Sequence, residues 1–303
     1  MSRLVRQVSL IAAAATCALA TTGCAGASSA EASSASVTVV ASTDVWGDIA
    51  ATVGGRRVNV TSLVTSPDQD PHTYNASARD ELAVSKADVV VENGGGYDDF
   101  MRQLVAAAKA DPTVIDAVDV SRLAAHRDEP NEHVWYDLEA AEKVARSMAA
   151  AFGKVDPAHA ADYASNARSF DSTVDRLIRH EAVLKRHVGG VAVAVTEPVP
   201  VYMLDAIGVA DVTPAAFSRA VEEGGDVSVA TLDATLGLLT GHRVAALVVN
   251  EQTADPFTER VRAAATSAGV PVVGVTETLP TDVHYADWMA HNLDHLDTAL
   301  SRR

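Results

Sequence analysis

The chain has 303 residues, a length typical of two domains, with 48% hydrophobic and 21% charged residues. This composition can bury a sizeable core and excludes a chain that is disordered throughout. The formal net charge of -16 argues against nucleic acid as a binding partner.

The first residues have the pattern of a secretory signal peptide. Arg3 and Arg6 precede an apolar run from Val8 to Ala20 that is too short to cross a bilayer. The following sequence, Thr-Thr-Gly-Cys, is similar to a bacterial lipobox, in which the cysteine is lipidated and becomes the new N-terminus. We therefore expect a signal over residues 1–23 and a lipid anchor on Cys24, with an ordinary cleaved signal as the alternative.

Residues 24–36 are rich in serine and alanine, so we expect a flexible tether there. The two cysteines of the chain, Cys17 and Cys24, lie in or next to the signal. A disulfide framework is therefore excluded for the mature protein.

From residue 37 onwards, apolar strands alternate with helical patterns, which predicts βα units and parallel sheets. The strands expected in the first half are Val37–Ala41, Val58–Val64, Asp88–Glu92 and Thr113–Val118. Those expected in the second half are Val191–Val195, Val244–Val249 and Val270–Val275.

One helical pattern is too long for a compact βα unit. Asp156 followed by Pro157 predicts a helix start, and apolar residues recur at helical spacing up to Gly189. About 30 helical residues span roughly 45 Å. We therefore predict an α/β fold with two lobes of parallel or mixed sheet flanked by helices, over 37–155 and 189–303, joined by one long rigid helix over 156–188.

Two glutamates follow predicted strands of the second lobe. In open parallel sheets, ligands bind beyond the carboxyl ends of the strands, where Glu197 and Glu277 are expected. Pro198 and Pro200 make a helix start at Glu197 awkward, which weakens the alternative that it caps a helix. Glu277 keeps the alternative of a loop carboxylate exposed to solvent.

Two histidines of the first lobe are candidate partners. His72 follows a loop rich in proline and aspartate, and His133 lies in the segment NEHVWYD. A lone histidine is more often structural, but two imidazoles with two carboxylates suit a divalent first-row metal ion.

Other features have weaker functional readings. Glu251 and Asp44 also follow strands and would compete with Glu277 as ligands, or they begin helices. His291 and His295 are expected on a solvated helix face. The segment GGGYDD lacks the lysine and spacing of a phosphate-binding loop, so we expect a βα turn.

The chain resembles the metal-binding solute-binding proteins of bacterial ABC importers, the zinc/manganese cluster, from about Val37 to Leu300. The segments that carry the resemblance are DPHTYNASARD, ADVVVENGGGYDDF, HVWYD, DPAHAADY, VTEP, VVNEQT, VTETLP and YADWMAHNLDHL. The resemblance implies two lobes bridged by a long helix, with one ligand from each of four segments. The implied metal ligands are His72, His133, Glu197 and Glu277. Glu197 stands where zinc-type members carry a third histidine, as in manganese-type members, and Glu277 replaces the usual aspartate.

The implied function is an extracytoplasmic lipoprotein, anchored through Cys24, that captures one divalent metal ion and delivers it to an ABC permease. We expect a monomer and no enzymatic activity. Carboxylates slightly favour Mn²⁺ over Zn²⁺, and Fe²⁺ fits as well, although intrinsic affinity favours Zn²⁺ over Mn²⁺. Metal affinity should fall below pH ~6, where protons compete for the ligands.

Two alternatives are a surface adhesin of the same fold and a secreted metallohydrolase. The hydrolase needs an open coordination position, whereas the sequence has no HExxH motif and four protein ligands would close the site.

Overall fold

The computed structural model describes residues 37–66, 69–123 and 131–301, which belong to one compact unit, Ser34–Arg303. The signal predicted for residues 1–23, the lipidation of Cys24 and the tether over 24–36 lie outside the described residues. Within the described ranges, no helix combines the length and apolar character needed to cross a membrane.

The first lobe contains a sheet of four parallel strands in the order β2-β1-β3-β4. The strands are β1 (Val37–Thr43), β2 (Val58–Val64), β3 (Val89–Glu92) and β4 (Thr113–Asp116), which confirms the four predicted there. β4 ends earlier than predicted because the Asp116 carboxylate accepts the N–H of Asp119 at 2.9 Å and caps α4 (Ala117–Ser121).

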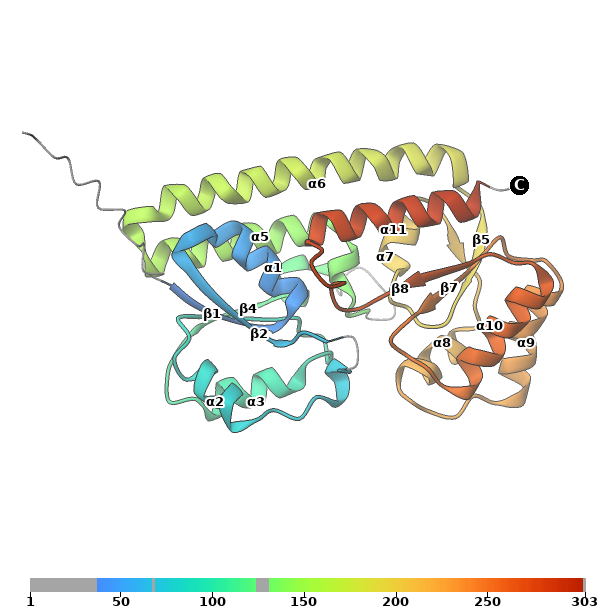
Figure 1. The fold of residues 1–303 in the computed structure, drawn as a ribbon, viewed down its shortest axis with the longest axis horizontal. Coiled ribbons are helices and arrows are strands. Elements are labelled where there is room, and N and C mark those ends of the chain that lie inside the picture. The colour runs from blue at the N-terminus through green and yellow to red at the C-terminus, as the bar shows by residue number, and fades with distance from the viewer. Residues whose placement is uncertain (1–36, 67–68, 124–130, 302–303) are drawn as a thin grey trace, which may run out of the picture. The chain divides into compact units, whose positions relative to one another are not determined.

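The central strands β1 and β3 are buried on both faces, which explains their nearly continuous apolar sequences. Val39 and Ala41 of β1 pack with α1 (Asp44–Gly54) and α5 (Leu138–Val155), whereas Val40 packs on the opposite face with α2 (Ala78–Val84) and α3 (Asp99–Ala107). Figure 1 shows the sheet between these two helical layers.

The second lobe also contains four parallel strands, in the order β6-β5-β7-β8. Its strands are β5 (Ala192–Val195), β6 (Ala210–Asp211), β7 (Leu247–Asn250) and β8 (Val272–Val275). Its helices are α7 (Val201–Ala206), α8 (Ala215–Glu222), α9 (Val229–Thr240), α10 (Pro256–Ala268) and α11 (Tyr285–Leu300). The sequence did not predict β6, because its two exposed residues form no apolar run.

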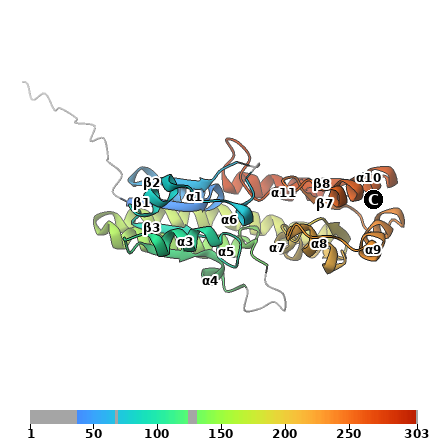
Figure 2. The ribbon, with the colours of Figure 1, turned by 90° about the horizontal axis from the view of Figure 1, so that it is seen from below.

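The predicted long helix is present, and it contacts both lobes. A short turn, η5 (Pro157–His159), leads into α6 (Ala160–Val188), which contacts α1 and α5 of the first lobe and α7 and α11 of the second. Figure 2 shows the lobes following one another along α6. The expected cap at Asp156 is different in the structure, because its carboxylate accepts from His159 Nδ1 and the Tyr163 hydroxyl instead of a backbone N–H.

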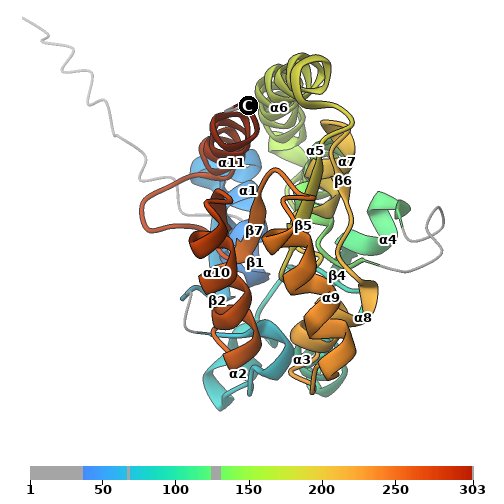
Figure 3. The ribbon, with the colours of Figure 1, turned by 90° about the vertical axis from the view of Figure 1, so that its right-hand side faces the viewer.

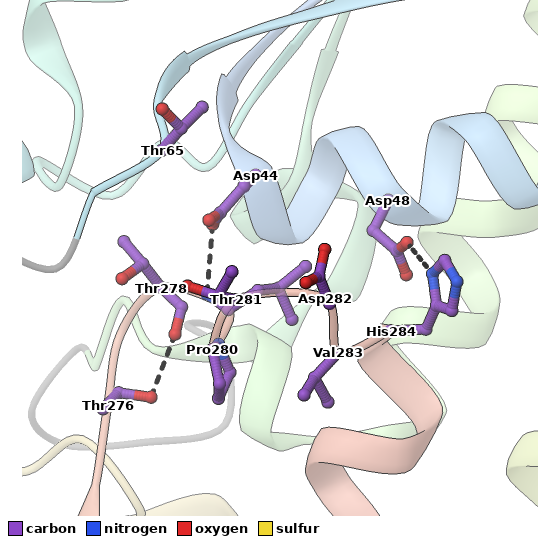
Figure 4. A pocket seen from close by; sticks show the side chains of 11 residues that line it. Asp44, Asp48, Thr65, Thr276, Thr278, Pro280, Thr281, Asp282, Val283 and His284 are labelled. Atoms are coloured by element: carbon purple, nitrogen blue, oxygen red, sulfur yellow. Dashed lines mark hydrogen bonds and ion pairs between the residues drawn. The ribbon is translucent and has the colours of Figure 1, made fainter.

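The segment between β8 and α11 is held on the first lobe. The Asp44 carboxylate accepts the N–H of Leu279 at 3.2 Å. Asp48 accepts from His284 Nδ1 at 2.6 Å (Figure 4). It also accepts the N–H of Tyr285 at 2.9 Å, at the start of α11. From there α11 runs side by side with α6 (Figures 1 and 3). Because Glu277 lies within this segment, its backbone is anchored to both lobes.

The GGGYDD segment is a turn after β3, as predicted. The Asp98 carboxylate accepts the N–H groups of Asn93 and Gly94 at 2.6 and 2.9 Å. Gly94 has a φ of +78°, and a Cβ there would overlap the Asp116 carboxylate. The Asn93 side chain donates to the carbonyl of Glu132 at 2.9 Å, so the turn supports the segment that carries His133.

This geometry predicts that Gly94→Ala destabilises the protein by about 2 to 5 kcal/mol, from left-handed strain plus overpacking against Asp116. The matched control is Gly269→Ala, which has a similar φ of +69° with no atom within 4 Å of its added Cβ. The control should lose only about 1 to 2 kcal/mol. Urea unfolding measures both losses, and equal losses would contradict the predicted clash.

Candidate metal-binding site

The structure brings the four predicted residues together around one cavity. The cavity measures about 630 Å³, and its lining includes His72, Glu197 and Glu277. His133 lies behind this lining, with its Nε2 3.9 Å from Glu277 Oε2. The first lobe therefore contributes the two imidazoles, and the second lobe contributes the two carboxylates.

His72 lies at the exposed side of the cavity, in the short turn η2 (Pro71–Thr73). The Asp70 carboxylate fixes this turn by accepting the N–H of His72 at 2.8 Å and the Thr73 hydroxyl at 2.9 Å. The His72 ring stands edge-on to Tyr97, with the ring centroids 5.0 Å apart. A capped turn and an aromatic neighbour thus orient the imidazole.

His133 is fully buried and precedes the turn η4 (Val134–Tyr136). The Asn131 amide nitrogen donates to the carbonyl of Pro198 at 2.9 Å, so its oxygen faces His133 Nδ1 at 2.8 Å. Because an amide oxygen only accepts, Nδ1 carries the hydrogen and Nε2 keeps its lone pair. Burial, followed by the charge of His72, lowers the pKa of His133 to about 3. The ring is therefore neutral and able to bind a metal ion through Nε2.

Glu197 follows β5 in a segment without regular structure, and α7 begins only after Pro200. Its side chain is 3% exposed, and burial raises the pKa of its carboxyl. The bond from Asn131 to Pro198 ties this segment to the one that carries His133.

Asn250, the last residue of β7, connects the two carboxylates. Its amide nitrogen donates to Glu197 Oε2 and to Glu277 Oε1, each at 2.7 Å. Its amide oxygen accepts the N–H of Gln252 at 3.1 Å, which fixes the orientation of the amide. Gln252 in turn accepts the N–H of Glu277 at 2.6 Å.

These bonds leave one oxygen of each carboxylate free to bind a cation. The buried side-chain atoms without a hydrogen-bond partner in the described residues include His133 Nε2, Glu197 Oε1, Glu222 Oε1 and Glu277 Oε2. Buried polar atoms are normally paired, so such a cluster of free nitrogen and oxygen atoms is suited to an ion. Burial, followed by the charge of Glu197, raises the pKa of Glu277 to about 7. A divalent cation would offset both effects.

The structure adds two acidic residues that the sequence analysis missed. Glu222 Oε1 lies 3.7 Å from His133 Nε2, and one ligand atom from each of His72, Glu132 and Glu222 lies within 4.8 Å of the others. Burial, followed by the charge of Glu132, raises the pKa of Glu222 to about 9. Glu132 could have been found in the sequence, because it directly precedes the candidate ligand His133. Glu222 is the last residue of a helix, and its local sequence gives no indication of a site.

Asp44 and Glu251, which would compete with Glu277 as ligands, do not line this cavity. Asp44 lines a second cavity of about 760 Å³ beside α1 and binds the backbone of Leu279 (Figure 4). Glu251 forms an ion pair with Arg262 at 3.2 Å. His291 and His295 are exposed on α11, as expected.

Comparisons with known proteins agree on the family of this chain. The chain is 30% identical over 174 residues to the manganese-binding lipoprotein MntA of Bacillus subtilis (strain 168), covering 55% of this chain and 56% of that protein. The chain spans about half the length of the curated relatives it matches.

Solved structures share the fold over nearly their whole length. The laminin-binding adhesin Lmb of Streptococcus agalactiae, as a mutant, matches with a TM-score of 0.74 and 20% identity, covering 87% of this chain and 99% of that chain. The periplasmic zinc-binding protein TroA of Treponema pallidum matches with a TM-score of 0.70 and 18% identity, covering 88% of this chain and 99% of that chain.

A family model described as zinc-uptake complex component A, periplasmic, matches residues 39–299. That range includes both lobes, the long helix and all the residues around the cavity. The chain therefore belongs to the zinc-uptake component A family of metal-binding solute-binding proteins.

Proposed function

We propose that this protein is an extracytoplasmic receptor that binds one divalent transition-metal ion and delivers it to an ABC permease. The proposed ligands are His72, His133, Glu197 and Glu277. The observation that carries the proposal is the unpaired Nε2 of a fully buried, neutral histidine facing free carboxylate oxygens from the opposite lobe. The family match supports the transport role.

The donor atoms of the proposed ligands suit three different metal ions. Nitrogen and carboxylate donors suit Mn²⁺, Fe²⁺ and Zn²⁺, and the two carboxylates slightly favour Mn²⁺. Relatives carry the names of manganese-, iron- and zinc-binding proteins, which is consistent with this range. Intrinsic affinity still favours Zn²⁺ over Mn²⁺ in a site of this kind.

The proposal includes a monomeric receptor held at the membrane by a lipid on Cys24, and the names of the lipoprotein relatives support the lipid anchor. Binding should change the lobes little, because α6 and the anchored 276–284 segment connect them. A metallohydrolase is less suited to the cavity, since a catalytic zinc site has three protein ligands and a water, whereas four protein ligands are proposed here.

We predict that the metal-free protein, residues 25–303, takes up one equivalent of metal when offered equal Mn²⁺, Zn²⁺ and Fe²⁺. The double variant Glu197→Ala, Glu277→Ala should take up far less, because it removes two of the four proposed ligands and their negative charge. Elemental analysis after gel filtration measures the bound metal and ranks the ions.

The matched control is Glu251→Ala, Glu259→Ala, which makes the same change in charge at the exposed Arg262 cluster. It should bind as the wild type does. Wild-type protein that stays empty would refute the proposed receptor function. A Glu197, Glu277 variant that binds fully would refute the ligand assignment.

We predict that metal affinity decreases as the pH is lowered from 8 to 6. The pKa of Glu277 is raised to about 7, so the metal-free carboxyl holds a proton at pH 6 and is mainly ionised at pH 8. A cation binds the ionised form, so each displaced proton lowers the affinity by up to about tenfold per pH unit below the pKa. His133, with its pKa of about 3, contributes nothing in this range.

Calorimetry at pH 6 in two buffers of different ionisation enthalpy measures the protons released per ion bound. Equal affinities at both pH values, with no proton release, would contradict the burial of Glu277 described above.

We predict that Asn250→Ala weakens metal binding by about 10- to 100-fold, the usual effect of losing a group that orients metal ligands. The variant keeps all four proposed ligands but loses the donors that align both carboxylates. The control is Asn166→Ala, which removes a side-chain bond to the carbonyl of Val53 in the first lobe. Competition with a chromogenic chelator measures both affinities, and equal values would show that Asn250 does not orient the ligands.

A further inference from the structure

Glu222 belongs to the same cluster of unpaired buried atoms as three of the proposed ligands. Its Oε1 lies 3.7 Å from His133 Nε2, closer than the 3.9 Å that separates Nε2 from Glu277 Oε2. Both Oε1 and Nε2 lack a hydrogen-bond partner among the described residues. At 3.7 Å the two atoms are too far apart to bond each other. Ligands about 2.0–2.2 Å from a common ion lie roughly 3 to 4 Å apart.

The end of α8 places Glu222 in this position. The N–H groups of Gly224 and Gly225 bond the carbonyls of Val221 and Ala220 at 3.0 and 2.7 Å, which ends the helix directly after Glu222. Gly224 has a φ of +63°, a conformation that favours glycine. Phe217 and Val221 pack into the core of the second lobe and fix the helix, whose last turn lines the cavity.

The position is unfavourable for a carboxylate in the absence of a cation. The C-terminal end of a helix repels negative charge, and Glu132, Glu197 and Glu277 lie close enough to Glu222 to repel it further. A local electrostatic conflict of this kind is typical of a functional site. The fully buried His133, with its free Nε2 directed at Glu222, distinguishes the cluster from a merely acidic surface.

We propose that Glu222 is an additional metal ligand of this site and that its carboxylate raises the affinity for Mn²⁺ relative to Zn²⁺. The inference rests on the proposed receptor function. With Glu222, two imidazoles and three carboxylates surround the ion. Zn²⁺ is satisfied by four ligands in a tetrahedron, whereas Mn²⁺ accepts more oxygen ligands. A third carboxylate therefore benefits Mn²⁺ more.

The test compares Glu222→Gln with Glu223→Gln in the 25–303 protein. Both variants remove one negative charge from residues that line the cavity, but Glu223 is exposed and is absent from the cluster of unpaired atoms. Competition with a fluorescent chelator gives dissociation constants for Mn²⁺ and Zn²⁺ separately. Electron paramagnetic resonance of bound Mn²⁺ reports its coordination. Circular dichroism of the metal-free variants establishes that they are folded.

We expect Glu222→Gln to weaken Mn²⁺ binding by at least about tenfold and Zn²⁺ binding by less, with a changed Mn²⁺ spectrum. Glu223→Gln should stay within about threefold of the wild type for both ions, with an unchanged spectrum. A third variant, Glu222→Asp, keeps the charge but withdraws the carboxylate, and it should also weaken Mn²⁺ binding. If Glu222→Gln does not fold, Glu222→Asp takes its place in the comparison.

Equal effects of Glu222→Gln and Glu223→Gln would overturn the proposal. They would indicate that Glu222 acts through its negative charge alone and does not bind the ion. Equal weakening of Mn²⁺ and Zn²⁺ by Glu222→Gln alone would overturn the preference for Mn²⁺. If the wild type binds neither ion, the proposed receptor function fails. If the wild type binds and Glu222→Gln binds as tightly, only the role of Glu222 fails.

Discussion

The hydrogen bonds from the Asn250 amide to Glu197 and Glu277 are the interaction on which the site depends. Two buried carboxylates repel each other, and Asn250 donates to one oxygen of each at 2.7 Å. The remaining oxygens are thereby left free on the cavity side. Because Gln252 fixes both the Asn250 amide and the backbone of Glu277, the end of β7 sets the geometry of the whole carboxylate pair.

Each lobe also orients the segments of the other lobe that carry proposed ligands. Asn131 of the first lobe binds both His133 and the carbonyl of Pro198, next to Glu197. The Tyr136 hydroxyl donates to the carbonyl of Thr276, next to Glu277, at 2.8 Å. Because of these hydrogen bonds between the lobes, the cavity has this geometry only when both lobes are in place. They also explain why a stiff α6 is compatible with function, since side chains can adjust while the lobes keep their positions.

The sequence was sufficient for the parts of the fold that have a strong pattern. Fully buried parallel strands produce apolar runs, and the stripe on α6 recurs at helical spacing from Tyr163 to Val188, so both could be predicted. Glu197 and Glu277 stood out because they follow predicted strands, whereas His72 and His133 were possible partners and the set of four was implied by the family resemblance. Their role as ligands still rests on the proposed function.

Other features depend on tertiary structure and leave no local pattern. β6 has two exposed residues and is defined only by its pairing with β5. Glu222 is the last residue of an ordinary amphipathic helix, and the sequence does not show that the end of α8 faces His133. In the sequence, Asn250 is only a residue at the end of an apolar strand. Its contacts with Glu197 and Glu277 join residues 53 and 27 positions apart in the chain.

The distribution of the cavity residues along the chain has a consequence for folding. Glu277 follows β8 of the second lobe, and the segment after it is bonded to α1 of the first lobe at Leu279 and Tyr285. A folding intermediate with the first lobe alone would present His72, Glu132 and His133 without the carboxylates of the second lobe. Such an intermediate would hold a divalent ion weakly. Under the proposed function, a metal ion would therefore stabilise the finished molecule much more than such an intermediate.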